Sequence, residues 1–163
     1  MKIAILQCDD VLEKFQTEYS NYPEMIMAML LSESSQSNQS SQLHFKTFDV
    51  RKAQYPDSLD DFDLFVITGS KASAYDDEPW IKNFIVYIGE LYEKSKKILG
   101  ICFGHQIIGL ALGAKVEKSD KGWGVGVAKN TLIQTTDGLG PVNAELNLLV
   151  SHQDQVLLLL LQQ

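Results

Sequence analysis

Short apolar runs alternate along the chain with stretches in which apolar residues recur at helical spacing. Nearly continuous apolar runs stand at residues 3–6, 64–67 and 97–99. Runs of this length predict strands that are covered on both faces of a sheet. Residues 43–48 alternate apolar and polar side chains instead, which predicts a half-exposed strand.

Two stretches between these strands have the pattern of amphipathic helices. The first lies within residues 13–31, where Pro23 stands near the start of the second half, a position that tolerates proline. Its methionines Met25 and Met29 are expected to fill the core. The second begins at Pro79, and its apolar side chains should face the sheet: Ile81, Phe84, Ile85, Ile88, Leu91 and Tyr92.

The other segments predict connections and a second extended region. Residues 32–42 are rich in Ser, Gln and Asn, which predicts a flexible surface connection. Residues 113–116 and 121–127 should be extended, the latter after a tight turn, and Asp137-Gly138 is a turn signal. The length of 163 residues suits one domain with a real core, so we expect a single domain over residues 1–163.

Composition excludes several classes of partner. The net charge is −7 and no block is rich in Lys or Arg, which argues against a nucleic-acid or anionic-membrane partner. Two cysteines, Cys8 and Cys102, are too few for a disulfide framework, and their spacing is not that of a metal site. We expect neither a metal nor a cofactor. No apolar run approaches the ~20 residues of a membrane span, so we expect a cytoplasmic protein.

Residues 100–106 carry the main candidate chemistry. The run at 97–99 predicts a strand and residues 107–112 predict a helix, so the chain must bend sharply near Cys102. A nucleophile at such a bend needs small residues two positions before and after it, and Gly100 and Gly104 stand there. A helix N-terminus also lowers the pKa of a thiol. The alternative interpretation is a buried structural cysteine.

A second candidate segment follows the strand at 64–67. Loops at the carboxyl ends of parallel strands are where such sheets hold their sites. The N–H groups of Gly69 and Ser70 are therefore candidates to complete an oxyanion hole with the N–H of Phe103. The alternative is a plain tight turn. His44 lies on the polar side of its strand, and we expect it to be only solvated.

The string Gly-Ile-Cys-Phe-Gly-His-Gln at 100–106 closely resembles the nucleophile motif of the class I glutamine amidotransferases, which release ammonia from glutamine through a cysteine thioester. Residues 2–8, 67–71, 75–80, 122–124 and 151–154 are also similar to blocks of stand-alone proteins of this kind, often labelled by similarity to the glutaminase domain of GMP synthase. The resemblance implies an α/β fold: a flavodoxin-like, doubly wound, mainly parallel sheet with helices on both faces.

The resemblance also implies roles for particular residues and partners. Glutamine would be the small-molecule substrate and a synthetase a possible partner; a homodimer is a separate expectation that comes from the apolar tail. Cys102 would be the nucleophile, and the loop with Gly69 would supply oxyanion donors together with Ser70 and Phe103. The residues implied to hold the substrate are Gln106, Ser151 and His152.

The chain departs from the family pattern at two places. The usual Gly-Gly-Pro loop reads Gly69-Ser70-Lys71, so the oxyanion geometry depends on whether the backbone there suits a side chain. The family's catalytic histidine, followed by proline and glutamate, has no counterpart before Gln163. Without this acid and base we expect the chain to be inactive or slower by roughly 10²–10⁴-fold.

The apolar tail at 156–161 has little chain after it to cover it, which favours truncation of a longer domain over a dimer that buries the tail.

A non-catalytic glutamine- or protein-binding module on the same fold is the alternative function. A third is a cysteine hydrolase of the intracellular-protease-like branch, in which histidine follows the nucleophile, whereas Phe103 stands there in this chain.

Overall fold

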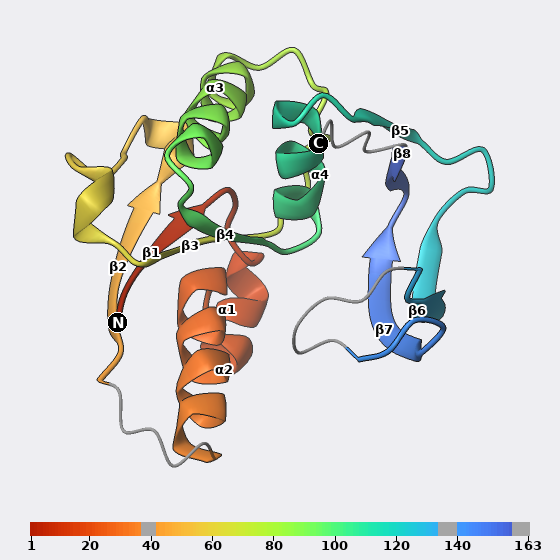
Figure 1. Cartoon of the computed structure of the whole chain (residues 1–163), viewed down its shortest axis with the longest axis horizontal. Helices are drawn as coiled ribbons and strands as arrows, with labels where there is room; N and C mark the ends of the chain where they lie inside the picture. Colours follow the sequence, from red (N-terminus) through yellow and green to blue (C-terminus); the bar gives the residue numbers. More distant parts are fainter. Residues whose placement is uncertain (37–41, 134–139, 158–163) are drawn as a thin grey trace. The chain divides into compact units, whose positions relative to one another are not determined.

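The computed structural model describes residues 1–36, 42–133 and 140–157, and for 33–36 only the backbone (Figure 1). Its contacts divide the chain into two compact units, Met1–Val116 with Val156–Gln163, and Glu117–Gln155. Each unit is described by itself. The expectation of one domain over 1–163 stays a prediction.

The first unit contains a four-stranded parallel sheet. Its strands are β1 (Lys2–Gln7), β2 (His44–Asp49), β3 (Leu64–Ile67) and β4 (Lys97–Gly100), in the order β2-β1-β3-β4. Central strand β1 aligns Ile5 with Thr47 on β2 and with Val66 on β3. Residues 3–6 and 65–67 are fully buried, as their apolar runs predict.

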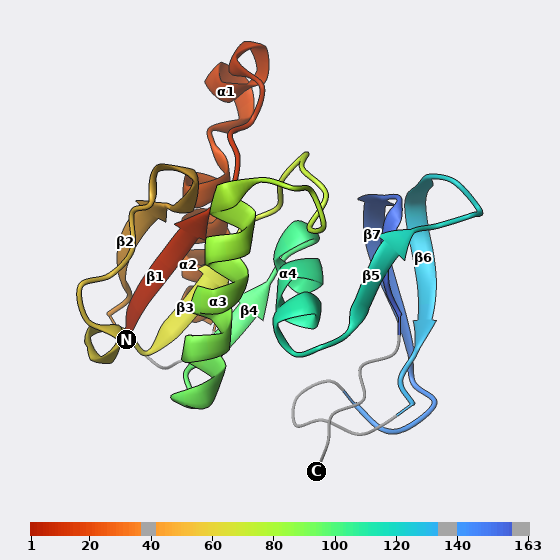
Figure 2. The ribbon, with the colours of Figure 1, turned by 90° about the horizontal axis from the view of Figure 1, so that it is seen from above.

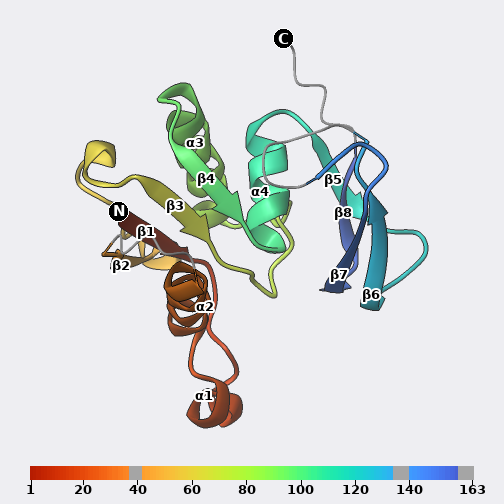
Figure 3. The ribbon, with the colours of Figure 1, turned by 60° about the horizontal axis from the view of Figure 1, so that its bottom comes forward.

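Helices cover both faces of this sheet, because successive side chains on a strand point to opposite sides. The helices are α1 (Glu13–Tyr19), α2 (Tyr22–Gln36), α3 (Pro79–Glu93) and α4 (Phe103–Ala111), and two short 3-10 turns are η1 (Val50–Lys52) and η2 (Leu59–Asp61). Ile3 and Ile5 pack with Ile26 of α2, whereas Ala4 and Leu6 belong to the core formed with α3 and α4. α3 and α4 cover the same face (Figure 2), and α2 lies on the other (Figure 3). The predicted doubly wound α/β fold is confirmed.

Several expected core positions are exposed. Met25 and Met29 of α2 are 45% and 46% exposed, so the expectation that they fill the core is wrong. Tyr92, near the end of α3, is also exposed. In β4, Ile98 packs against the core formed with α3 and α4, whereas Leu99 points to the opposite face and is 43% exposed. The apolar run at 97–99 is therefore not a buried strand.

Two predicted connections differ from expectation or fall outside the described residues. α2 continues to Gln36, so part of the Ser-rich stretch 32–42 is helical. Residues 37–41, the Asp137-Gly138 turn and residues 158–161 of the apolar tail lie outside the described residues. Residues 156–157 belong to β8 (Asp154–Leu157), which pairs with β5 (Lys115–Lys118).

The second unit contains an antiparallel pair, β6 (Gly124–Thr131) and β7 (Glu145–His152). Its register sets Val127 opposite Leu149 and Gly124 opposite His152. β6 follows a glycine turn at Gly122, where φ is 81°, as the glycine spacing predicts. Within the described ranges, no helix combines the length and the apolar character needed to cross a bilayer.

Candidate functional site

The chain bends between β4 and α4 at Cys102, the residue that precedes the first turn of α4. Cys102 has φ 51° and ψ −105°, in a region that residues with a side chain rarely adopt. A Cβ on Gly100 would lie 2.6 Å from the His105 nitrogen, and one on Gly104 would lie 2.8 Å from the Ile67 Cβ. The structure therefore has the predicted bend, and its close approach requires both glycines.

The bend exposes the Cys102 side chain at the N-terminus of α4. The first intrahelical hydrogen bond of α4 runs from the Gln106 N–H to the Cys102 carbonyl at 3.1 Å, and the Gly104 N–H donates to the Ile101 carbonyl. The Phe103 N–H precedes these bonds, at the positive end of the helix dipole. An anion on the Cys102 sulfur is favoured at this position.

The loop after β3, residues 68–72, lies beside Cys102. A Cβ on Gly69 would be 3.9 Å from the Cys102 Cβ. Thr68 anchors the start of this loop, since its Oγ1 accepts a hydrogen bond from the Cys8 N–H at 2.8 Å and donates one to the Gly69 carbonyl at 3.0 Å. The structure thus brings together Cys102 and the loop that the sequence singles out.

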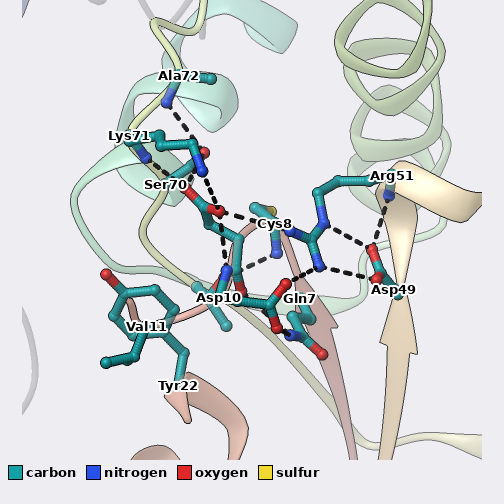
Figure 4. Close-up of polar contacts among 12 residues, drawn as sticks. Gln7, Cys8, Asp10, Val11, Tyr22, Asp49, Arg51, Ser70, Lys71 and Ala72 are labelled. Atoms are coloured by element: carbon teal, nitrogen blue, oxygen red, sulfur yellow. Dashed lines mark hydrogen bonds and ion pairs between the residues drawn. The ribbon is translucent and has the colours of Figure 1, made fainter. Parts of the chain in front are cut away.

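Asp9, which follows β1, contacts the same loop. The Lys71 N–H donates to Asp9 Oδ2 at 2.9 Å, and the Ser70 hydroxyl donates to the same oxygen at 3.5 Å. Ser70 Oγ in turn accepts from the Ala72 N–H at 3.1 Å (Figure 4). Asp9 is only 5% exposed, so the loop lies against a buried carboxylate.

Arg51 connects three carboxylates at the carboxyl ends of β1 and β2. Its guanidinium donates to Asp10 at 2.6 Å, to Asp49 at 2.8 Å and to Asp9 at 3.4 Å (Figure 4). Burial opposes the charged form of Asp9, but the hydrogen bonds from the Lys71 and Asp10 N–H groups outweigh it and hold its pKa below the ordinary value. Hydrogen bonding to Asp49 is the main reason that the pKa of Arg51 is raised.

Tyr22, the first residue of α2, lies near this cluster. Burial raises the pKa of its phenol, and the negative charges of Asp9 and Cys102 raise that pKa further. The phenol is therefore within electrostatic reach of both groups. Asp9 and Tyr22 are not among the site residues that the sequence predicts. The position of Asp9 after a buried strand, at the edge where parallel strands hold their sites, is the signal that points to it.

The other predicted site residues fall into two groups. Phe103 and Gln106 are buried in α4, where the Phe103 ring packs on Trp80 with a centroid distance of 5.6 Å. Ser151 and His152 belong to β7 in the second unit, and His152 Nδ1 lies 2.9 Å from the Asp154 carbonyl oxygen. Their predicted contact with substrate stays a prediction.

The remaining histidines stand at different ends of the first unit. His44 begins β2, at the opposite end of the sheet from the loop 68–72, and His105 is exposed on the first turn of α4. Within the described residues, no group of three His, Cys, Asp or Glu side chains is arranged to hold a metal ion.

Comparison with known proteins gives consistent results. The family model described as glutamine amidotransferase class-I matches residues 24–156. A glutamine amidotransferase-like protein of Schizosaccharomyces pombe is 37% identical over 141 residues, covering 83% of this chain and 56% of that protein. Gamma-glutamyl peptidase 5 of Arabidopsis thaliana is 36% identical over 119 residues, covering 68% of this chain and 47% of that protein. The chain thus spans about half the length of these relatives.

A solved structure shares the fold. The crystal structure of a glutamine amidotransferase from Thermotoga maritima superposes with a TM-score of 0.70 at 22% identity, covering 97% of this chain and 64% of that one. At this identity the likeness supports the fold of the described units and no specific activity.

Proposed function

The chain belongs to the class I glutamine amidotransferase family, and we propose that its Cys102 attacks the γ-carbonyl carbon of a γ-glutamyl amide, with glutamine as the first candidate. The observation that carries the proposal is the geometry of Cys102. Cys102 is exposed at the N-terminus of α4 with a positive φ of 51°, and a Cβ on Gly69 of the loop after β3 would lie 3.9 Å from its Cβ. A thiolate there has access to a carbonyl group and to backbone donors.

The proposed step conserves atoms and charge. The Cys102 sulfur adds to the carbonyl carbon, and the carbonyl oxygen becomes an oxyanion that accepts hydrogen bonds from the Ser70 and Phe103 N–H groups. The oxyanion then re-forms the carbonyl as the carbon–nitrogen bond breaks, and the leaving nitrogen takes one proton from solvent water, so that a neutral amine departs and the γ-glutamyl thioester remains. Asp9 already accepts the Lys71 N–H, which supports Ser70 over Lys71 as the donor from this loop.

Two sets of relatives support a γ-glutamyl group as the recognised unit. The names of the relatives include glutamine amidotransferase-like proteins and gamma-glutamyl peptidases. Both names refer to a glutamyl side chain with an amide at its γ-carbon. We therefore propose Gln106, Ser151 and His152 as groups that hold this unit, with a synthetase as the partner that uses the ammonia, or a second copy of the chain as a homodimer partner.

Release of the amine requires a proton, and the sequence lacks the family's histidine that would donate it. None of its three histidines is followed by proline, and His44 lies at the far end of the sheet from Cys102. We therefore propose that this chain forms the thioester slowly with glutamine, because ammonia leaves poorly without a proton donor. The same observation favours a second candidate, a module that binds glutamine or a protein without hydrolysing it.

Two reagents test the proposal on the full chain. A chloroketone analogue of glutamine should alkylate Cys102, and excess glutamine should protect it. γ-Glutamyl p-nitroanilide should release p-nitroaniline in an amount equal to the protein, because this amine is a much weaker base than ammonia and needs less proton assistance. The modified peptide is identified by mass spectrometry.

Matched variants separate the outcomes. Cys102→Ala should abolish both reactions, and Cys8→Ala should change neither, since Cys8 is 1% exposed. Glutamine protection without any p-nitroaniline release would favour the binding module. Reaction of Cys102→Ala at the rate of the unaltered chain would refute Cys102 as the nucleophile.

A further inference from the structure

We infer that Asp9 is a positioning residue, which fixes the loop 68–72 beside Cys102 through the Lys71 N–H and the Ser70 hydroxyl. The inference rests on the proposed function, because the loop matters to the chemistry only if its N–H groups stabilise an oxyanion. Asp9 itself touches neither the sulfur nor the substrate in this proposal. It acts through the backbone of residues 69–71.

The loop is attached to the end of β1 at two points. Thr68 Oγ1 accepts the Cys8 N–H at 2.8 Å, and Asp9 Oδ2 accepts the Lys71 N–H at 2.9 Å. Gly69 and Ser70 lie between these attachments, and a Cβ on Gly69 would lie 3.9 Å from the Cys102 Cβ. Cys8 and Asp9, two adjacent residues that follow β1, therefore hold the two sides of the segment 69–70, which carries the proposed oxyanion donor.

The Asp9 carboxylate is suited to hold the loop because its own position is fixed. Its Oδ1 accepts from the Asp10 N–H at 2.8 Å and from Lys71 Nζ at 3.2 Å, and Arg51 lies 3.4 Å away. The side chain is 6% exposed, so these donors replace the water that a charged carboxylate requires. Moving the carboxylate would break several hydrogen bonds at once.

The ion pair between Asp9 and the Lys71 ammonium is the less important contact. The Lys71 side chain is 81% exposed, and exposed pairs contribute little to stability. The hydrogen bond from the Lys71 N–H to Asp9 contributes more, because its acceptor is buried and it holds the backbone of the loop in place. Lys71→Ala removes the ammonium and keeps this N–H, so the two contacts can be measured separately.

The consequence is a selective effect on carbonyl chemistry. Addition of Cys102 to a γ-glutamyl carbonyl develops negative charge on oxygen and depends on the loop donors. Alkylation by iodoacetamide displaces iodide at a saturated carbon and develops no such charge. A loosened loop should therefore slow the first reaction and leave the second unchanged, whereas a general loss of structure or of thiolate would alter both.

The kinetic test compares variants of Asp9 on the full chain. Asp9→Ala should lower the maximal rate of Cys102 acylation by γ-glutamyl p-nitroanilide about 10-fold or more, with little change in the half-saturating concentration and in the iodoacetamide rate. Asp9→Asn keeps an acceptor oxygen and should recover most of the lost rate. Asp60→Ala removes an exposed, ion-paired carboxylate elsewhere and should change neither reaction.

Hydrogen exchange tests the contact without relying on the proposed function. The Lys71 amide should exchange about 10-fold faster or more in Asp9→Ala, and should keep its protection in Lys71→Ala. Unchanged exchange in Asp9→Ala would overturn the inference, as would an equal loss of acylation and alkylation. If the unaltered chain reacts with iodoacetamide but never with the anilide, the proposed function fails and the catalytic role of Asp9 fails with it, even where exchange confirms the contact.

Discussion

At the scale of single residues, the two cysteines show how surroundings set reactivity. Cys8 is 1% exposed, and burial raises its pKa to about 12. Cys102 is exposed at a helix N-terminus, where the dipole favours the thiolate. The same thiol group is therefore inert at one position and accessible at the other.

We expect iodoacetamide to modify Cys102 in the folded chain at neutral pH at least about 10³-fold faster than Cys8, because a thiol with a pKa near 12 is almost entirely protonated. Peptide mapping by mass spectrometry at timed intervals measures both rates. In urea the two cysteines should react at similar rates, which is the internal control. Equal rates in the folded chain would contradict the burial of Cys8.

Tyr55 and Tyr87 have hydroxyl groups that are buried in apolar surroundings. Their rings lie 4.5 Å apart, and their hydroxyls are buried without a hydrogen-bond partner among the described residues. An unpaired buried hydroxyl costs about 1–3 kcal/mol. Burial accordingly raises the pKa of Tyr55 to about 12.

Tyr55→Phe or Tyr87→Phe should therefore leave the free energy of unfolding unchanged or raise it, by up to about 1–3 kcal/mol. Urea denaturation followed by circular dichroism measures this quantity. Tyr92→Phe, at an exposed position of α3, is the matched control and should have no effect. A clear destabilisation by either buried substitution would mean that its hydroxyl has a partner.

Residues whose signal is local can be predicted from the sequence. Cys102, Gly100 and Gly104 lie within five positions, so their spacing alone predicts the bend that the structure has. Asp9 and Tyr22 reach the same region from β1 and α2, and no spacing along the chain records that approach. Their contribution depends on how the strands pair.

At the scale of elements, α4 can approach β3 and β4 only because two glycines lack side chains. A Cβ on Gly100 would meet backbone atoms of Gly104 and His105, and a Cβ on Gly104 would meet the carbonyl oxygen and the branched Cβ and Cγ2 of Ile67. Backbone atoms cannot rotate away as a flexible side chain can. The helix would have to move as a unit.

Gly104→Ala should therefore lower the free energy of unfolding by about 1–3 kcal/mol or more. Gly89→Ala is a matched control within α3, where a Cβ would meet nothing within 4 Å, and it should raise stability by about 0.5–1 kcal/mol. Urea denaturation midpoints of the two variants give the comparison. Similar midpoints would show that α4 does not pack against β3 as closely as described.

Burial of whole elements was harder to predict than their type. A strand forms at the predicted run 97–99 and a helix within the predicted stretch 13–31, although α2 extends beyond it to Gln36, yet Leu99 and Met25 are exposed. Burial depends on which elements cover each face of a strand: Ile98 of β4 packs on the core with α3 and α4, and Leu99 points to the opposite face. An apolar run alone does not record this.

At the scale of the whole molecule, charge at the carboxyl edge of the sheet couples stability to pH. The pKa values of Asp9, Asp10 and Asp49 are all lowered in the folded chain, chiefly through hydrogen bonds that outweigh burial where burial opposes the charge. An unfolded chain binds protons at these groups more readily. Folded stability that depends on them is present above pH 4 or so and is lost as pH falls further.

We therefore expect the urea midpoint to fall as pH is lowered below about 4, toward and through the folded pKa values of these carboxyls. Asp49→Asn removes one titrating group and should flatten this fall, although it should lower stability at pH 7 by weakening the contact with Arg51. A midpoint that stays constant from pH 5 to about pH 2 would contradict the lowered pKa values.

The order of strands in the sheet also bears on how the chain folds as it is made. β1 precedes both of its neighbouring strands in the sequence. Ile3 can pair only after Phe45 of β2 and Leu64 of β3 have been synthesised. Parallel partners so far along the chain form late and slowly. During synthesis β1, whose residues 3–6 are fully buried in the folded chain, therefore emerges before either strand that pairs with it, and this interval is when a nascent chain is most prone to aggregate or to need a chaperone.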